Sequence, residues 1–552
     1  MAPKYQEIAA IAQKRRAEAL NAAYQIPDYD VKDLPKDLRS VTAQAGVLTA
    51  EELEIINLDV GEILQRIRDR KLTAVATTTA FCKAAAVAQK VTNCVTEVLF
   101  KEGLERAKFL DEYQEKTGQV VGPLHGLPIS LKDQFATPPH PSSVGMAIFA
   151  NEPTKKEALI ATVLRDLGAV IYVKTNVPTG MAMGETRNNI FGETLNPFNK
   201  GAAPGGSSGG EGALIAMKGS PLGVGSDIAG SIRIPSAVCN LYGLKPSHGR
   251  FSGFGSKGAL AGVDFLHGVI GPMCRSLNGV KIFAEAVCSE RVALWEHDPQ
   301  MLPIPWRRNV IQPPGRKLKI GILWNDGNVT PHPPISRALE TVRRVLTEAG
   351  HEVIDWEPID HDALIKSGGE GLDLLGTDAF IEMLERYDED IYRVIRQQFN
   401  ADPKDLTPQK LREMIMNREQ LKKAYLDRWM ATGKDGGRVM DGIIAPVWPL
   451  VANPLRFAEV QHYVGYTSVF NTLDYSACTF PVTFASKSLD PKRGPEWRPL
   501  NESDAIIQDA YDPDFFDGTP VTLQLVGKRL EEEKVVEMVE IVSEALKAAG
   551  VH

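Results

Sequence analysis

The stretch PGGSSGGEGA at residues 204–213, together with GSDIAGSIRIP at residues 225–235, decides the interpretation of this chain. Both segments mix glycine with serine, and no histidine lies between them. Glycine permits backbone angles and close approaches that other residues cannot make. A serine hydroxyl in such a loop can meet a substrate while nearby backbone N–H groups point at one spot, which is the geometry that acyl transfer needs. Neither segment supplies a base.

A candidate base lies upstream, in GLPISLKDQ at residues 126–134. Leu127, Ile129 and Leu131 alternate with smaller or polar residues, which predicts a short strand that ends at Lys132. Desolvation at the end of a buried strand favours the neutral form of a lysine, and a neutral lysine is a competent general base. Most lysines at strand ends are solvated surface charges, so this prediction depends on the three segments taken together.

Taken together and in this order, the three segments resemble the amidase signature family. The likeness covers about residues 45–550 and includes four further segments: KTNVP at 174–178, LYGLKPS at 241–247, IIAP at 443–446 and PVTLQLVG at 520–527. Within the family, the chain looks closest to fungal acetamidase-type and fatty acid amide hydrolase-type enzymes. The resemblance implies an α/β fold in which one large mixed β-sheet lies between helical layers.

The resemblance also implies a catalytic unit of two serines and one lysine. Ser231 would be the nucleophile, Ser207 the bridging serine that follows a cis peptide bond, and Lys132 the base. Protons would pass from Ser231 through Ser207 to Lys132 and return to the leaving amine. The oxyanion would be held by the backbone N–H groups of Ile228, Ala229, Gly230 and Ser231.

Other site residues are implied by the same resemblance. Supporting hydrogen-bond partners are expected at Ser208, Asp227 and Arg233, and the acyl side of the pocket is expected at Met181 and Phe135. The family commonly has glycine where this chain has Ala229, and an alanine that had to adopt a positive φ would be strained. Without that requirement, its methyl group only narrows the pocket. Ser226 stands where threonine is frequent.

The order of predicted elements supports the α/β class. Helices are expected at 5–25, from 53 to 67 after a capping box at Thr49 and Glu52, and at 73–90, 103–117, 156–167 and 334–349. Strands are expected at 127–131, 170–173, 318–323 and 353–356, and a strand–helix pair at 521–548. We interpret residues 1–45 as an N-terminal helical extension, residues 46–552 as one catalytic domain, and about 375–435 as a charged helical cover.

Composition limits the partners. The 552 residues carry a formal net charge of −8, which argues against nucleic acid. The six cysteines lack a framework spacing, and the ten histidines form no metal motif, so we expect reduced thiols, no metal and no cofactor. The chain shows no signal-peptide pattern and no apolar run of about eighteen residues, so a cytoplasmic location without a transmembrane segment is expected.

The function expected from these patterns is hydrolysis of a small-molecule carboxamide to a carboxylate and ammonia or an amine, through an acyl-enzyme. Small aliphatic amides come first, and fatty acid amides, N-acylethanolamides, anilides, esters and carbamates follow. A homodimer through the N-terminal helices is possible. Two alternatives stay open. One is an α/β-hydrolase elbow with Ser207 as nucleophile, which the segment NKGAAP at 199–204 disfavours because it is no apolar strand. The other is a non-catalytic assembly subunit on an amidase scaffold.

Overall fold

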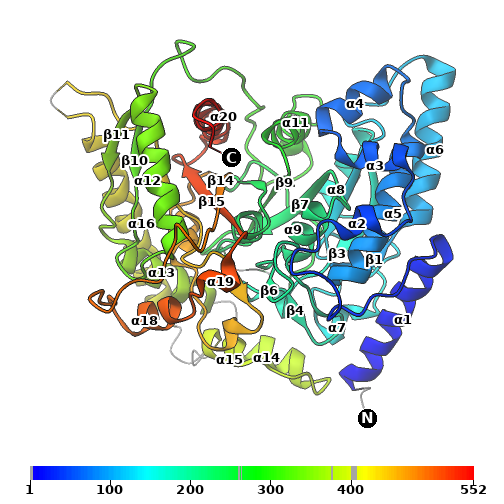
Figure 1. Cartoon of the computed structure of the whole chain (residues 1–552), viewed down its shortest axis with the longest axis horizontal. Helices are drawn as coiled ribbons and strands as arrows, with labels where there is room; N and C mark the ends of the chain where they lie inside the picture. Colours follow the sequence, from blue (N-terminus) through cyan, green and yellow to red (C-terminus); the bar gives the residue numbers. More distant parts are fainter. Residues whose placement is uncertain are drawn as a thin grey trace.

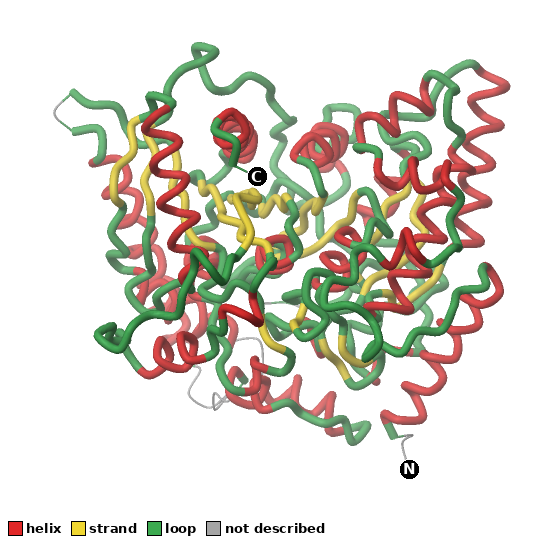
Figure 2. The backbone as a smooth tube through the Cα atoms, viewed as in Figure 1, coloured by secondary structure: helices red, strands yellow, loops and turns green. Residues whose placement is uncertain are grey.

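An 11-stranded mixed sheet forms the centre of the molecule, a computed structural model in which residues 4–258, 262, 264–373, 377–399, 407–434 and 436–551 are described. The strands cross the middle of the molecule in Figure 2, with helices outside them. From one edge to the other, the order is β1 (Val95–Val98), β3 (Val170–Thr175), β2 (Pro128–Lys132), β7 (Leu222–Asp227), β9 (Val269–Cys274), β8 (Tyr242–Lys245), β14 (Ala477–Phe484), β15 (Pro520–Val526), β12 (Gly442–Pro446), β10 (Lys319–Ile322) and β11 (Glu352–Asp355).

Helices surround this sheet (Figure 1). In the first half of the chain they are α1 (Tyr5–Ala23), α2 (Val41–Gln44), α3 (Ala50–Asn57), α4 (Val60–Arg68), α5 (Ala74–Thr92), α6 (Phe100–Thr117), α7 (Ala147–Ala150), α8 (Leu159–Asp166), α9 (Gly209–Ala216), α10 (Arg233–Val238) and α11 (Leu277–Val287). In the second half they are α12 (Pro333–Glu348), α13 (His361–Asp373), α14 (Thr377–Glu385), α15 (Arg393–Gln398), α16 (Pro408–Ala431), α17 (Gly465–Thr472), α18 (Glu502–Asp509), α19 (Pro513–Phe516) and α20 (Glu532–Ala548).

Strand β15 shows how the two faces of the sheet differ. Side chains of successive strand residues point to opposite faces. Leu523 and Leu525 belong to the main hydrophobic core together with Val535 and Val539 of α20. Gln524 lies between them, and its side chain accepts a hydrogen bond from the first residue of α10. One face of the strand is therefore apolar core, and the other carries polar groups toward the serine-rich loops.

The start of the chain confirms the predicted capping box and corrects the helix after it. Thr49 accepts from the Glu52 N–H, and the Glu52 carboxylate accepts from the Thr49 N–H. The single helix expected from 53 to 67 is two helices, α3 and α4, because the chain turns at Leu58. The carboxylate of Asp59 accepts from the Gly61 N–H and begins a second helix there.

Strand direction brings the predicted base to the serine loops. Strand β2 is parallel to both of its neighbours, β3 and β7. The carboxyl ends of parallel strands meet at the same edge of a sheet. Lys132 is the last residue of β2 and Asp227 the last of β7, so the lysine and the loop that follows β7 lie together.

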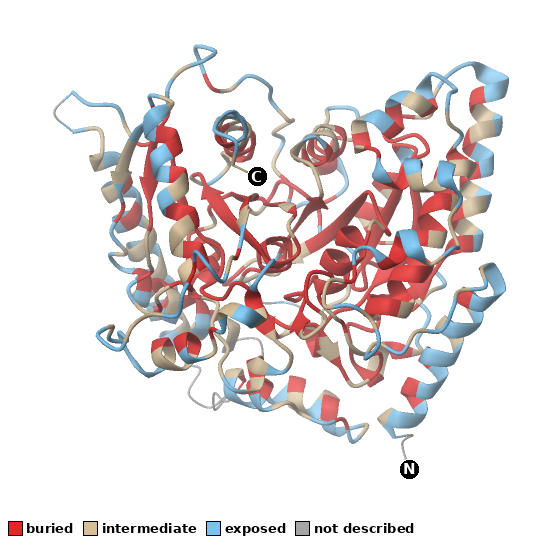
Figure 3. Ribbon diagram, viewed as in Figure 1, coloured by how far each residue is buried: buried red, intermediate tan, exposed pale blue. Residues whose placement is uncertain are grey.

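In the described residues, the predicted helical cover contains α14, α15 and α16, whereas its positions 375–376, 400–406 and 435 lie outside the described residues. Helices α14 and α15 bury Phe380, Leu384, Val394 and Ile395 in one cluster with Met183. The sheet is almost entirely buried in Figure 3, whereas the outer surfaces of the helices are exposed. The cover is thus attached to the body through an apolar contact.

Gly103 of α6 is the point of closest approach between that helix and β3. A β-carbon at Gly103 would lie 2.9 Å from the β-carbon of Tyr172, whereas one at Gly369, an exposed glycine of α13, would meet nothing within 4 Å. We expect Gly103→Ala to lower the free energy of unfolding by about 1–3 kcal/mol through this clash. The matched Gly369→Ala variant should raise it by about 0.5–1 kcal/mol through helix propensity. Urea denaturation followed by circular dichroism measures both, and equal shifts in the two variants would contradict the close approach.

Candidate active site

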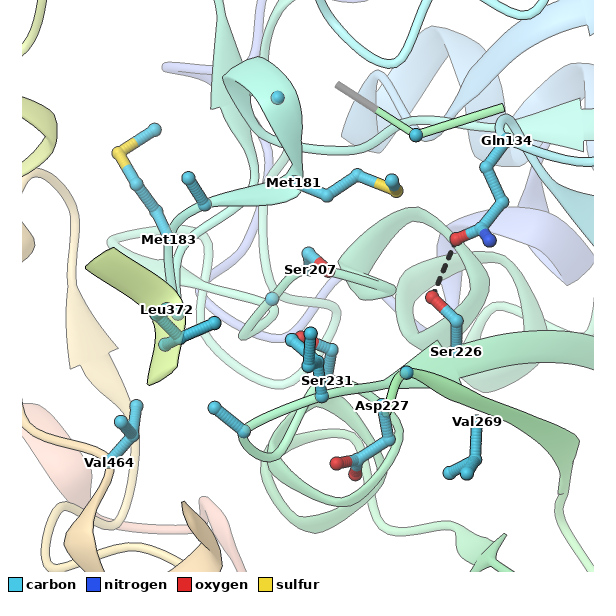
Figure 4. A pocket seen from close by; sticks show the side chains of 18 of the residues that line it. Gln134, Met181, Met183, Ser207, Ser226, Asp227, Ser231, Val269, Leu372 and Val464 are labelled. Atoms are coloured by element: carbon cyan, nitrogen blue, oxygen red, sulfur yellow. Dashed lines mark hydrogen bonds between the residues drawn. The ribbon is translucent and has the colours of Figure 1, made fainter. Parts of the chain in front are cut away.

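Lys132 is fully buried at the end of β2 and donates two hydrogen bonds to serines. Its Nζ lies 2.7 Å from Ser207 Oγ and 2.8 Å from Ser226 Oγ. The Ser226 hydroxyl donates in turn to Gln134 Oε1 at 2.6 Å, the contact drawn as a dashed line in Figure 4. The two serine acceptors fix the position of Nζ, and Gln134 in turn holds the hydroxyl of Ser226, so the lysine faces Ser207 in one geometry.

Burial lowers the pKa of Lys132 to about 7, although the carboxyl groups of Asp227 and Glu211 act in the opposite direction. Burial also raises the pKa of Glu211 to about 8, while the hydroxyls of Ser130 and Thr175 donate to it at 2.5 and 2.9 Å. A lysine with a pKa near neutrality is partly deprotonated at pH 7, so it can accept a proton there. The prediction of a desolvated lysine is confirmed by its burial.

The loop that carries Ser207 packs against the backbone of residues 183–185. The Gly206–Ser207 peptide bond is cis, and Gly205 has a φ of +76°. A β-carbon at Gly206 would lie 2.5 Å from the carbonyl oxygen of Met183 and 2.8 Å from the backbone nitrogen of Glu185. Only glycine fits there, because both neighbours are backbone atoms.

A buried ion pair shapes the second serine loop. Arg233 and Asp227 are both fully buried, and the guanidinium donates from Nε and Nη2 to the two carboxylate oxygens at 3.0 Å each. Burial alone would raise the pKa of Asp227, but Arg233 and the Asn471 amide hold that pKa well below its usual range. Arg233 also donates to Gln524 Oε1 and to the Thr467 carbonyl. The supporting role expected for Asp227 and Arg233 thus has a geometric basis.

The predicted oxyanion loop is only partly free to bind a ligand. The N–H of Gly230 donates to Asp227 Oδ1 at 2.8 Å, so this donor is already used within the loop, and an oxyanion role for Gly230 stays a prediction. No described residue accepts a hydrogen bond from the N–H groups of Ile228, Ala229 and Ser231. Gly230 has a φ of +129°, whereas Ala229 is not in the left-handed region, so the alanine is accommodated without backbone strain.

The two serine loops open on a cavity of about 470 Å³. Ser207, Ser226 and Ser231 all line it, and Figure 4 shows the first and last of them near the centre of the view. Its apolar wall includes Met181, Met183, Ile228, Val269, Leu372, Phe399 and Val464. Met181, which was expected at the pocket, thus lines this cavity.

Phe135, the second residue expected at the pocket, is fully buried in the main core and does not contact the cavity. The chain turns after Lys132, with the Phe135 N–H donating to the Lys132 carbonyl, and Phe135 then pairs as an isolated bridge with Ser256. Proximity to the lysine in sequence was a misleading signal.

Ser208 joins the two serine loops. Its backbone N–H donates to the Ser231 carbonyl at 3.2 Å, and its hydroxyl accepts from the Ser226 N–H at 3.3 Å. Sequence reasoning missed Gln134, which lies two residues after the lysine, and Glu211, which lies inside the serine motif. It also missed Thr467, Asn471 and Gln524. These three lie far away in sequence and carry no local pattern.

The described part of the chain holds neither a candidate metal cluster nor a helix that could span a membrane. No group of three or more His, Cys, Asp or Glu side chains there could hold a metal ion. None of the helices described has the length and apolarity to cross a bilayer. All six cysteines are buried free thiols.

Comparison with known proteins places this site in a family context. A family model described as Amidase matches residues 76–536. The acetamidase of Emericella nidulans is 36% identical over 558 residues, which cover 99% of both proteins. A putative amidase of Schizosaccharomyces pombe is 38% identical over 93% of this chain and 95% of its own length. A solved structure of a fatty acid amide hydrolase superposes with a TM-score of 0.90 at 30% identity, covering 98% of this chain and 95% of that one.

The buried ion pair generates a stability prediction. Asp227→Asn leaves the Arg233 guanidinium buried without a carboxylate, so we expect the free energy of unfolding to fall by about 3–5 kcal/mol. The control is Asp37→Asn, which breaks the partly exposed pair between Asp37 and Arg39 and should change it by about 1 kcal/mol or less. Urea denaturation measures both variants. A loss at Asp227 no larger than that of the control would contradict the role given to the ion pair.

Proposed function

The chain belongs to the amidase signature family, and on that basis we propose that it is a serine amidohydrolase in which Ser231, Ser207 and Lys132 convert a carboxamide and water to a carboxylate and ammonia or an amine. One observation carries the assignment. A fully buried lysine with a pKa of about 7 lies 2.7 Å from Ser207 Oγ, at a cavity that Ser231 also lines. Histidine is not needed as the base in this arrangement.

The first half of the reaction forms an acyl-enzyme. Neutral Lys132 accepts the proton of Ser207 Oγ, and Ser207 accepts the proton of Ser231 Oγ. Ser231 Oγ attacks the carbonyl carbon, and the resulting oxyanion accepts hydrogen bonds from the N–H groups of residues 228, 229 and 231. The proton returns through Ser207 to the nitrogen, the C–N bond breaks, and the amine leaves. Water then attacks the acyl group by the same steps and releases the carboxylate.

The proton relay answers the main difficulty of amide hydrolysis, which is a poor leaving group. The amine must be protonated as it departs, so the group that accepts a proton from the nucleophile must also return it. The charged neighbours of Ser231 in its own loop are unsuited to this, because Asp227 and Arg233 are paired with each other. The base must therefore come from another strand.

The cavity supports substrates larger than the smallest amides. Its volume of about 470 Å³ lies within the range of about 300–1,000 Å³ typical of small-molecule sites. Small aliphatic amides remain the first class to test, because two curated relatives are named acetamidases. Longer acyl amides follow from the apolar wall and from the fatty acid amide hydrolase structure. Esters, carbamates and anilides present the same attackable carbonyl.

Identification of the nucleophile tests the proposal directly. Ser231→Ala should lower kcat by at least about 10⁴-fold, because the acyl-enzyme no longer forms. Ser236→Ala, a buried serine of the neighbouring α10, is the matched control and should retain wild-type turnover. Intact-mass spectrometry after treatment with a fluorophosphonate should place one adduct on Ser231 in the wild type and in the control. An adduct on Ser207 would support the elbow alternative instead.

The pKa of Lys132 predicts the acid limb of the pH profile. Only the neutral amine accepts a proton, so kcat/KM should rise tenfold per pH unit below pH 7 and level off above about pH 7. Lys132→Arg keeps the positive charge but cannot deprotonate, so it should be inactive across the whole range. Stopped assays between pH 5 and 9 on a neutral amide measure this. An unchanged acid limb in Lys132→Ala would assign the base to another group.

A further inference from the structure

Two polar side chains of the cavity take no part in the proton relay. Gln398, the last residue of α15, and His462 both line the cavity beside the apolar side chains of Leu372, Phe399 and Val464. A polar pair in an apolar wall is the usual way in which a pocket orients one polar group of its ligand. The hydrogen bonds of Gln398 and His462 determine which donors or acceptors the pair can present to a ligand.

The protonation of His462 follows from its first partner. The backbone N–H of Gly184 can only donate, and it lies 3.0 Å from His462 Nε2, so Nε2 carries no proton. Burial lowers the pKa of His462 to about 4, which keeps the ring neutral at neutral pH. A neutral imidazole has one N–H, so the proton is on Nδ1.

The second partner of His462 must therefore be an acceptor. Nδ1 lies 2.7 Å from the carboxamide nitrogen of Gln398. Two donors cannot face each other at this distance, and a half-turn of the carboxamide places Oε1 against the Nδ1–H without moving any other atom. The carboxamide N–H₂ then points away from His462. Among the described residues no other group bonds to this carboxamide, and Gln398 lines the cavity.

Helix α15 holds Gln398 in place. The Val394 N–H donates to Glu459 Oε2 at 3.3 Å, and the other oxygen of Glu459 pairs with Arg187 at 2.5 Å. The Arg187 guanidinium lies over the ring of Tyr392, 4.2 Å from its centroid. These contacts fix the first turn of the short helix. At its last residue, the hydrogen bond to His462 holds the carboxamide itself.

We propose that Gln398 is a specificity-determining residue whose carboxamide N–H, oriented by His462, donates to an acceptor oxygen of the substrate remote from the scissile amide. The substrates selected are amides whose acyl or amine chain carries an ether, carbonyl or hydroxyl oxygen at the depth of Gln398. The proposal rests on the proposed function for the reacting end of the substrate. One such hydrogen bond corresponds to about a tenfold preference in kcat/KM.

A substitution at Gln398 tests the proposal more directly than one at His462. A change at His462 also releases the Gly184 N–H, and the Gly184 backbone lies 3.0 Å from where a Gly206 β-carbon would be. It would thus disturb the loop of Ser207 and lower all turnover. Gln398→Met keeps the length of the side chain and removes only its polar atoms. Gln397→Met, on the exposed side of the same helix, is the matched control.

The experiment is an oxygen scan along the substrate. A series of primary alkanamides of equal length, in which one methylene at a time is replaced by an ether oxygen, is assayed for kcat/KM. In the wild type and in Gln397→Met, one oxygen position should be favoured about tenfold over its neighbours. In Gln398→Met this peak should disappear. A flat series in the wild type, or a peak that survives in Gln398→Met, overturns the proposal.

A binding measurement tests the role of Gln398 independently of the proposed hydrolysis. Dissociation constants of the same amides for Ser231→Ala, measured by calorimetry with and without Gln398→Met, report the subsite independently of turnover. A peak in binding that depends on Gln398, in a wild type that hydrolyses no amide, would support the subsite and refute the proposed function. Amide turnover without a Gln398-dependent peak in either kcat/KM or binding would support the proposed function and refute the subsite.

Discussion

The ion pair between Asp227 and Arg233 is the interaction on which the rest of the site depends. It lies out of contact with solvent, so each charge must be matched by a partner inside the protein. The partners come from four elements: Asp227 ends β7, Arg233 begins α10, Asn471 belongs to α17 and Gln524 to β15. The loop between the two charges is thereby bent around the carboxylate, which accepts hydrogen bonds from the N–H groups of Gly230 and Ile232.

The burial of Lys132 is a second constraint, and it lowers the free energy of unfolding at neutral pH. Lys132 is buried beside hydroxyl groups rather than beside a carboxylate, and the lowered pKa reflects the free-energy cost of its charged form. Between its folded pKa of about 7 and the value of an exposed lysine, the unfolded chain binds more protons, so this group makes folding less favourable at neutral pH than at alkaline pH. The same desolvation gives Lys132 the pKa near neutrality that its proposed role as general base requires.

Features encoded within a few residues could be predicted from the sequence. The strand before Lys132 follows from its alternating apolar residues, and the capping box at Thr49 from its spacing. Features that depend on the placement of distant segments could not. Gly230 was expected to donate its N–H to a ligand, yet that N–H donates to the carboxylate of Asp227. Phe135 was expected at the pocket, yet it lies in the core after a turn that no local sequence pattern predicts. The Gln398–His462 pair joins residues that are brought together only by the tertiary fold.

The hydrogen bond from Arg233 to Gln524 also determines when, during synthesis of the chain, the site can be completed. Strand β15 is near the end of the chain, whereas Lys132 and both serine loops belong to its first half. During synthesis on the ribosome, Arg233 therefore cannot form its hydrogen bond to Gln524 until almost the whole polypeptide has been made. Contacts of such sequence separation form late because the intervening loop must close first. Hydrolytic competence is then a property of the finished chain, and a nascent fragment that already contains the lysine and the serines has no assembled site.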